Sequence, residues 1–221
     1  MKKCTLSILS MLLSFACNIQ TEPFCYKQLC NQDLSSFQQF CNITFKDYIT
    51  SDQDKDFLSG WDIQKYLLAI ADRTNQLLYI NACFHKNVCI GFQILQINST
   101  PQETTKSLYL YDTESNKNIY PYAFIETTFI RKEYRRQGIA TKLLEMSEKI
   151  CHDNNYEVIV RIGKSYNQAA NNMYHKCNYE QVDPQKISLW AKHAFTNEPI
   201  DIISNSKSVL FLKHISKNSN P

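Results

Sequence analysis

The stretch EYRRQGIATKLLEMSEKI, residues 133–150, combines charge and glycine in a way that suits anion binding. Arg135 and Arg136 supply positive charge, and Gly138 is one of only four glycines in the chain. If a helix begins here, its first amides lack partners and carry a partial positive charge, which favours phosphate. Gly138 and the small Ala140 let the backbone approach an anion closely. The same residues also fit a solvated basic turn that binds no anion. The neighbouring elements are therefore needed to distinguish the two interpretations.

The elements on either side of this turn are an expected strand and an expected helix. Residues 120–130 are rich in β-branched and aromatic side chains, which favours a strand. Apolar residues recur at helical spacing after the turn and predict a helix from about 137 to 154. The nearly continuous apolar run 156–163 predicts a buried strand, and a short helix is expected at 166–176.

The rest of the chain adds a hairpin, late strands and earlier helices. Their order predicts an α/β fold in which a mixed sheet carries helices on both faces. Helices are expected at 34–40 and 61–75, strands at 77–84, 88–97, 107–112, 178–183 and 207–215, and an irregular stretch around Trp190.

A second motif follows the buried strand. Asn167, Ala170 and Tyr174 are spaced by three and four residues, and Asn178 and Tyr179 come just after them. Taken alone, Tyr174 fits a packed aromatic side chain on a helix. Together with the basic turn, however, this order resembles the GNAT superfamily of N-acetyltransferases. In that family R/Q-x-x-G-x-G/A opens a helix and N-x-x-A-x-x-x-Y-x-x-x-G-F follows the next strand.

The resemblance covers about residues 60–183 and departs from the family at two positions. Asn178 and Tyr179 stand where the family usually has Gly and Phe. Asn is the next best residue after Gly for a left-handed helix cap, so the expected geometry is retained. The resemblance implies the GNAT-like fold, a central, mostly antiparallel sheet of about seven strands that is flanked by helices and splayed at the cofactor-binding strand.

The resemblance also implies acetyl-CoA as co-substrate and no metal. The pyrophosphate is expected at backbone amides of the basic turn. The pantetheine arm is expected along the end of the 120–130 strand and at Asn167. The residues expected to contact acetyl-CoA are Phe129, Ile130, Arg135, Arg136, Gln137, Gly138, Ile139, Ala140, Thr141 and Asn167.

Two side chains are expected to take part in proton transfer. Tyr174 matches the family tyrosine that donates a proton to the CoA sulfur, and a phenol with a pKa of about 10 suits a thiol leaving group. Glu126 matches a strand position at which several members keep a general base. A carboxylate in an apolar strand is costly without a partner, so a substrate-binding or structural role stays open. A backbone N–H of Phe129 or Ile130 is the expected donor to the carbonyl oxygen.

The overall composition indicates a globular protein and excludes some partners. Apolar residues make up 43% of the 221 residues, which suits one domain of ordinary size. The net charge is only +3, so nucleic acid is not an expected partner. None of the nine cysteines follows a zinc-binding pattern. Cys151 and Cys177 are expected to be small buried side chains.

The N-terminus differs from the rest. Two lysines precede an apolar stretch from Leu6 to Cys17, which is shorter than the roughly 20 residues that span a bilayer. It fits a secretory signal, and Ala16 before Cys17 resembles an imperfect lipoprotein processing site. We therefore expect a leader at 1–17 and one domain at 18–221. This implies an exported protein or one attached to the membrane through a lipid at Cys17, and a cytoplasmic location is the alternative.

Two functional interpretations follow from these observations. The first is an N-acyltransferase that moves an acetyl group directly from acetyl-CoA to an amine-bearing acceptor, either a small molecule or a peptide. The second is an exported or lipid-anchored protein that keeps the fold and binds a ligand without catalysis. The leader favours the second, because acetyl-CoA is cytosolic, whereas the basic turn and Tyr174 favour the first. Monomer and homodimer both stay open.

Overall fold

The computed structural model describes residues 24–30, 33, 35–39, 78–98, 108–119, 121–183, 186–192, 199–201 and 208–215. The expected leader at 1–17 and the expected helix at 61–75 lie outside these residues. Within the described part, no helix is both long and apolar enough to cross a membrane.

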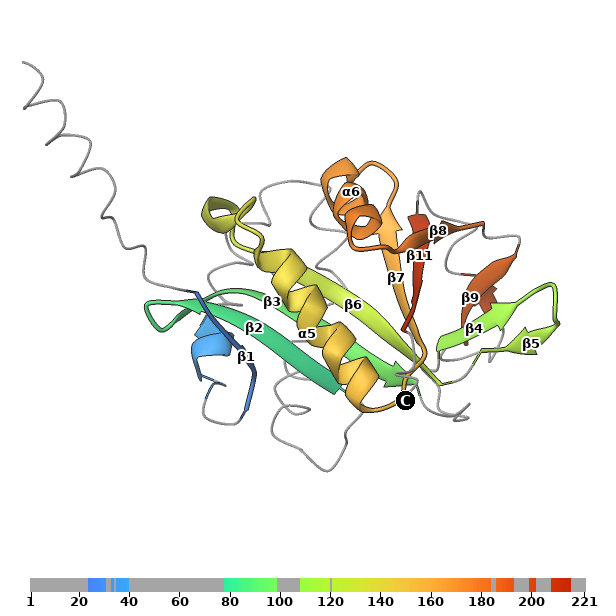
Figure 1. Cartoon of the computed structure of the whole chain (residues 1–221), viewed down its shortest axis with the longest axis horizontal. Helices are drawn as coiled ribbons and strands as arrows, with labels where there is room; N and C mark the ends of the chain where they lie inside the picture. The colour runs from blue at the N-terminus through green and yellow to red at the C-terminus, as the bar shows by residue number, and fades with distance from the viewer. Residues whose placement is uncertain are drawn as a thin grey trace, which may run out of the picture.

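A seven-stranded sheet forms the centre of the molecule (Figure 1). Its strands lie in the order β1-β2-β3-β6-β7-β11-β8, and β6 and β7 are parallel while their neighbours pair antiparallel. This confirms the expected mixed sheet. The strands are β1 (Cys25–Gln28), β2 (Leu78–His85), β3 (Val88–Asn98), β6 (Tyr122–Ile130), β7 (Val158–Lys164), β8 (Glu180–Val182) and β11 (Ser208–His214).

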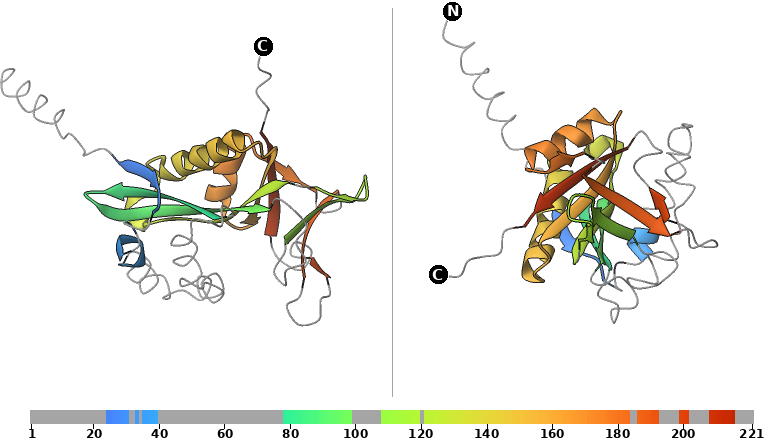
Figure 2. Two further views of the ribbon diagram at one scale, coloured as in Figure 1. Left: turned by 90° about the horizontal axis from the view of Figure 1, so that it is seen from below. Right: turned by 90° about the vertical axis from the view of Figure 1, so that its right-hand side faces the viewer.

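Helices cover both faces of this sheet, as expected (Figure 2). Helix α5 (Ile139–Asp153) buries Leu143 and Leu144 against one face. Helix α6 (Gln168–Lys176) packs on the same face over β7. On the opposite face the helical residues 35–39 bring the ring of Phe37 to 5.1 Å from that of Phe92. The core therefore lies in two layers, one on each side of the sheet.

A second, smaller sheet has the strand order β10-β9-β4-β5. It comprises β4 (Leu108–Asp112), β5 (Lys117–Asn118), β9 (Ile187–Lys192) and β10 (Pro199–Asp201). Trp190 belongs to β9 and pairs with Tyr109 of β4, so the expectation of an irregular segment there is wrong. The short β9 finds its partner β4 far away along the chain, and local residue preferences do not reveal such a pairing.

Most of the other boundaries agree with the sequence within a few residues. Strands β2 and β3 form the expected hairpin, and Lys86 and Asn87 at its tip have φ of 50° and 62°. Positive φ at both residues is typical of the tight turn that fits the twist of paired strands. The short helix α6 begins at Gln168, directly after its cap.

Candidate functional site

The parallel strands β6 and β7 separate partway along their length. Their pairing ends where Ile125 faces Arg161, although β6 continues to Ile130 and β7 to Lys164. Beyond this point the backbone of β6 no longer pairs with β7. The expected splay of the sheet therefore lies at the second half of β6.

A β-bulge in β6 coincides with this separation. Thr127 pairs with Ile94 and Ile125 pairs with Leu95, so Glu126 is an extra residue with no opposite residue on β3. A bulge bends its strand and re-aims the side chains that follow. Before the bulge, Ile125 packs on the face that α5 covers; after it, Phe129 packs on the opposite face. The predicted base, Glu126, thus lies where β6 bends and where the alternation of its side chains between the two faces of the sheet shifts by one residue.

Arg161 contacts the backbone at this bulge. Its Nη1 donates hydrogen bonds to the carbonyl oxygens of Ile125 at 3.0 Å and Glu126 at 2.7 Å. Arg161 is not among the residues that the sequence predicts to belong to the site. A signal was present, because Arg161 is the one charged side chain inside the apolar run VIVRIG of β7.

The backbone of the basic turn contains two residues in a left-handed conformation. Arg136 and Gly138 adopt positive φ of 65° and 78°. A Cβ added to Gly138 would meet no atom within 4 Å, so the space in front of this residue is open. Gly138 is the N-cap of α5, with no side-chain cap and no acidic residue in the first turn. The amides of Ile139, Ala140 and Thr141 belong to that first turn and have no acceptor inside the helix.

The remaining side chains of the turn differ in their contacts. Arg135 is turned back, and its Nε donates to the carbonyl oxygen of Ile130 at 3.0 Å. Gln137 donates from Nε2 to the carbonyl oxygen of Glu133 at 3.3 Å. Arg136 is exposed. The turn is thus held by Arg135 and Gln137, while Arg136 extends from it toward solvent.

The end of β6 lies unusually close to the neighbouring strand. A Cβ on Gly91 of β3 would lie 2.6 Å from Cδ1 of Ile130 and 2.9 Å from the carbonyl oxygen of Phe129. Only glycine permits this approach. Beyond Ile130, the hydroxyl of Tyr134 lies 3.2 Å from Nδ1 of His85. The β2–β3 hairpin therefore supports the segment that joins β6 to α5.

The second motif forms the start and end of α6. Oδ1 of Asn167 accepts a hydrogen bond from the amide of Ala170 at 3.2 Å, which makes Asn167 the N-cap. This bond uses the oxygen of the Asn167 side-chain amide and not its Nδ2. Asn178 follows the helix with a φ of 61°, which confirms the left-handed cap expected from its identity.

Tyr174 lies in the core beneath α6. Its side chain is 3% exposed, and its ring centroid lies 5.3 Å from that of Phe211 and 5.5 Å from that of Tyr179. These contacts are those of a packed aromatic residue. The role of its hydroxyl group as an acid stays a prediction, as does the role of Glu126 as a base.

A buried chain of polar side chains links α5 to three strands. Nδ2 of Asn81 donates to Oγ of Ser147 at 3.0 Å, and Ser147 donates to Oε1 of Gln93 at 2.6 Å. Nε2 of Gln93 then donates to Oγ1 of Thr128 at 2.9 Å, in the splayed part of β6. None of these four residues is predicted from the sequence to interact, although Asn81 and Gln93 are polar residues inside apolar strands.

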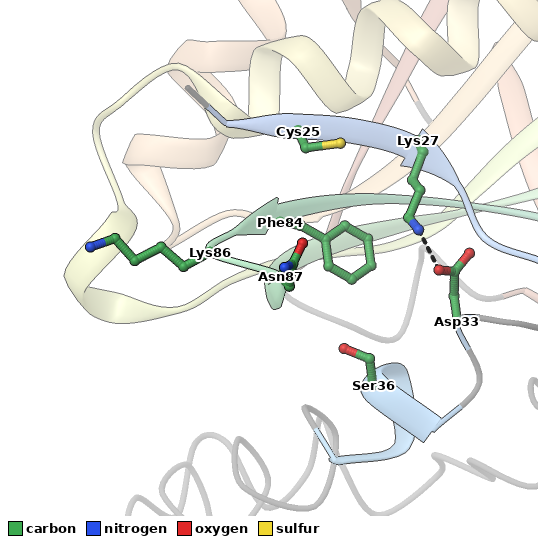
Figure 3. Close-up of a pocket in the computed structure, with 7 residues that line it drawn as sticks. All are labelled: Cys25, Lys27, Asp33, Ser36, Phe84, Lys86 and Asn87. Atoms are coloured by element: carbon green, nitrogen blue, oxygen red, sulfur yellow. Dashed lines mark hydrogen bonds and ion pairs between the residues drawn. The ribbon is translucent and has the colours of Figure 1, made fainter. Parts of the chain in front are cut away.

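A separate cavity of about 490 Å³ lies under the β2–β3 hairpin (Figure 3). It includes the ion pair between Lys27 and the buried Asp33. It lies on the face of β1 and β2 opposite α5, because the neighbouring Tyr26 packs toward α5. The lining residues are Cys25, Lys27, Asp33, Ser36, Phe84, Lys86 and Asn87, and none is a predicted site residue.

The described residues also contain no group of three or more His, Cys, Asp or Glu side chains that could hold a metal ion. No disulfide joins the cysteines of the same part of the chain. Cys151 is buried, as expected, whereas Cys177 is only partly buried.

Several solved structures share this fold. PaiA N-acetyltransferase from Thermoplasma acidophilum in complex with coenzyme A superposes with a TM-score of 0.59 at 15% identity, covering 87% of this chain and 99% of that one. Arabidopsis thaliana NAA60 in complex with acetyl-CoA gives 0.55 at 17% identity, over 87% and 100%. A probable acetyltransferase from Staphylococcus epidermidis gives 0.57 at 13% identity, over 88% and 100%. At these identities the likeness establishes the fold.

Comparison with curated protein sequences finds no significant match. The model of the acetyltransferase (GNAT) family, in contrast, matches residues 37–179, which include β6, the basic turn, α5 and the whole of α6. The chain therefore belongs to the GNAT family of acetyltransferases.

Proposed function

We propose that the protein is an N-acyltransferase that moves an acetyl group directly from acetyl-CoA to an amine acceptor. One observation carries this proposal: the half of β6 that no longer pairs with β7, after Ile125, is joined by residues 131–138 to the uncapped N-terminus of α5. The part of β6 that pairs with β3 but not with β7 and the helix amides without intrahelical acceptors thus lie on either side of the basic turn. A pantetheine arm with an adjacent pyrophosphate has the matching chemistry, because its amides pair with a strand and its phosphates with helix amides.

The binding residues are those of the basic turn and the strand end. The amides of Gly138, Ile139, Ala140 and Thr141 would hold the pyrophosphate, with Arg136 adding positive charge. Phe129 and Ile130 would pair with the pantetheine arm through their backbone, and Asn167 would reach it from α6 with the amide nitrogen that its cap leaves available. The complexes of relatives with coenzyme A and acetyl-CoA support this choice of co-substrate.

The transfer needs a neutral amine, a polarised carbonyl and a protonated leaving group. In the proposed reaction the amine nitrogen forms a bond to the acetyl carbon, and the C–S bond of the thioester breaks. Glu126 takes the proton that the amine loses, directly or through water. Tyr174 gives its phenolic proton to the departing thiolate and regains one from solvent. A backbone N–H of Phe129 or Ile130 stabilises the carbonyl oxygen as it gains negative charge.

The alternative is a GNAT-fold protein that binds a ligand without catalysis. The burial of Tyr174 between two rings favours it, because a packed phenol reaches a substrate less easily. The apolar stretch that ends at Cys17 also favours it. We propose an exported or lipid-anchored location on the basis of that stretch. Mass spectrometry of the mature protein tests it, since loss of residues 1–16 with a lipid on Cys17 is the expected product.

Calorimetry followed by a turnover assay tests the proposed enzyme. Titration of the folded protein with acetyl-CoA should release heat with one site per chain. A panel of amines, including small polyamines, peptide N-termini and lysine side chains, should then show release of free CoA with at least one acceptor. Binding without turnover across the panel would favour the binding protein, and no heat with any CoA thioester would refute the proposed enzyme.

A further inference from the structure

Arg161 is a charged residue in the middle of an otherwise apolar strand. Its neighbours Ile159 and Val160 are fully buried, and Arg161 itself is partly buried. Burying a guanidinium group is costly unless its N–H groups find acceptors. Nη1 finds two, the carbonyl oxygens of Ile125 and Glu126. Nε is also buried and has no acceptor among the described residues, so the position is not optimised for burial alone.

The two carbonyl groups need this arginine because of where they lie. At Ile125 the pairing of β6 with β7 ends, and at Glu126 the bulge interrupts the pairing of β6 with β3. Buried backbone carbonyls without partners are rare and costly. A side chain of β7 thus replaces the backbone of β7 as the partner of β6. The planar guanidinium group occupies the point from which the two strands diverge.

Arg161 also stands between the two predicted catalytic side chains. On one side it binds the backbone of Glu126. On the other side its strand neighbour across the β7–β11 pair is Phe211, on which the ring of Tyr174 stacks at 5.3 Å. Arg161 therefore binds the strand that carries Glu126 directly and is the strand neighbour of the ring on which Tyr174 packs.

We propose that Arg161 is a positioning residue that holds β6 and β7 apart at the width the thioester needs and fixes the backbone of Glu126. This inference rests on the proposed function. Without the guanidinium group, β6 would lose two hydrogen bonds at the bulge. Glu126 and the strand end that is expected to pair with the pantetheine arm, Phe129 and Ile130, would then be displaced. Loss of the guanidinium group should therefore weaken acetyl-CoA binding and lower turnover together.

Three variants at this position test the proposal. Arg161→Met keeps much of the volume and removes every donor, so KM for acetyl-CoA should rise about tenfold or more, as expected when charged hydrogen bonds are lost. Arg161→Lys keeps a charge and a donor and should stay within about fivefold of wild type. Lys117→Met, an exposed strand position in the second sheet, removes a cation far from the site and should leave KM unchanged.

Chemical rescue separates positioning from a general loss of folding. Arg161→Ala leaves room for a small cation, so methylguanidinium ions should restore a measurable part of its turnover. Tetramethylammonium ions carry the charge without N–H donors and should restore none. A merely structural arginine would show parallel losses of melting temperature and turnover, with no rescue.

The outcomes distinguish this proposal from the proposed function. If wild type and Arg161→Met bind acetyl-CoA equally and turn over equally, the role of Arg161 is refuted and the enzyme stands. If rescue fails and Arg161→Lys is as impaired as Arg161→Met, the role is also refuted. If wild type binds no CoA thioester by calorimetry, the proposed function falls and this inference with it.

Discussion

Ser147 of α5 donates a 2.6 Å hydrogen bond to Oε1 of Gln93 on β3, in the fully buried interior between helix and sheet. Ser147 also accepts from Asn81, and Gln93 continues to Thr128 on β6. Each member donates in the same direction, so the hydroxyl proton of Thr128 remains for another acceptor. Hydrogen bonds arranged in such a chain strengthen one another. The chain connects the helix that starts at the basic turn with the strand that is splayed.

Ser147→Ala should destabilise the protein by about 1–3 kcal/mol, because it leaves buried polar groups of Asn81 and Gln93 without partners. Urea denaturation measures this change. Ser165→Ala, at an exposed position, is the matched control and should change the free energy of unfolding by less than about 0.5 kcal/mol. Equal effects of the two substitutions would show that the buried chain does not contribute to stability.

Gly138→Asp and Gly138→Asn form a pair that tests the phosphate site. Both residues tolerate the positive φ of 78° better than other side chains, and the space in front of Gly138 accepts either. Only Asp adds a negative charge where the pyrophosphate is expected. Calorimetry should therefore show at least about tenfold weaker acetyl-CoA binding for Asp than for Asn, a loss that salt reduces.

The stability of the two variants should not follow their affinity for acetyl-CoA. A negative charge at a helix N-terminus is favourable, so Gly138→Asp should be at least as stable to urea as Gly138→Asn. An Asp variant that binds acetyl-CoA as tightly as the Asn variant would contradict the assignment of the turn.

Tyr174→Phe tests the proposed acid. The ring contacts with Phe211 and Tyr179 stay in place, so the free energy of unfolding should change by about 1 kcal/mol or less. Turnover should fall about a hundredfold or more while acetyl-CoA affinity is retained, since general acid catalysis typically contributes that much. Steady-state rates and calorimetry measure the two effects.

The control for this substitution is Tyr179→Phe, which removes the hydroxyl group from the neighbouring buried ring. It should leave turnover unchanged. If Tyr174→Phe and Tyr179→Phe have the same rate as wild type, Tyr174 is a core residue and the acid lies elsewhere.

A final prediction concerns the link between β11 and the two helices. Nζ of Lys213 binds Glu148 of α5 at 2.8 Å and the carbonyl oxygen of Cys177 at the end of α6 at 2.9 Å. Both charged side chains are about one-fifth exposed, at 20% and 21%. Lys213→Met should therefore cost about 1–3 kcal/mol in urea unfolding, more than an exposed ion pair would.

The Lys142–Glu145 pair on the surface of α5 provides the comparison, because both of its side chains are more than half exposed, at 54% and 55%. Lys142→Met should change the free energy of unfolding by less than about 1 kcal/mol. Equal costs for the two lysines would mean that the Lys213 contacts add nothing beyond a surface pair.

Local patterns were sufficient to predict the elements that carry the two motifs. The apolar spacing after Gly138 predicts α5 to within two residues, and Asn178 predicts its own left-handed conformation. Such features depend on residues close together in the chain, because helix periodicity, caps and positive φ are set within a few residues. Local sequence is therefore enough to predict the turn, the helix that follows it and the left-handed residue that ends α6.

Contacts between distant segments of the chain set how these elements are placed relative to one another. The register of β6 against β3 and β7 places the bulge at Glu126 and ends the parallel pairing at Ile125, opposite Arg161. The assignment of Trp190 to β9 and the buried chain through Ser147 depend on the same kind of contact. Strand pairing and buried polar contacts join segments far apart in sequence, and their energy comes from partners that no local pattern contains.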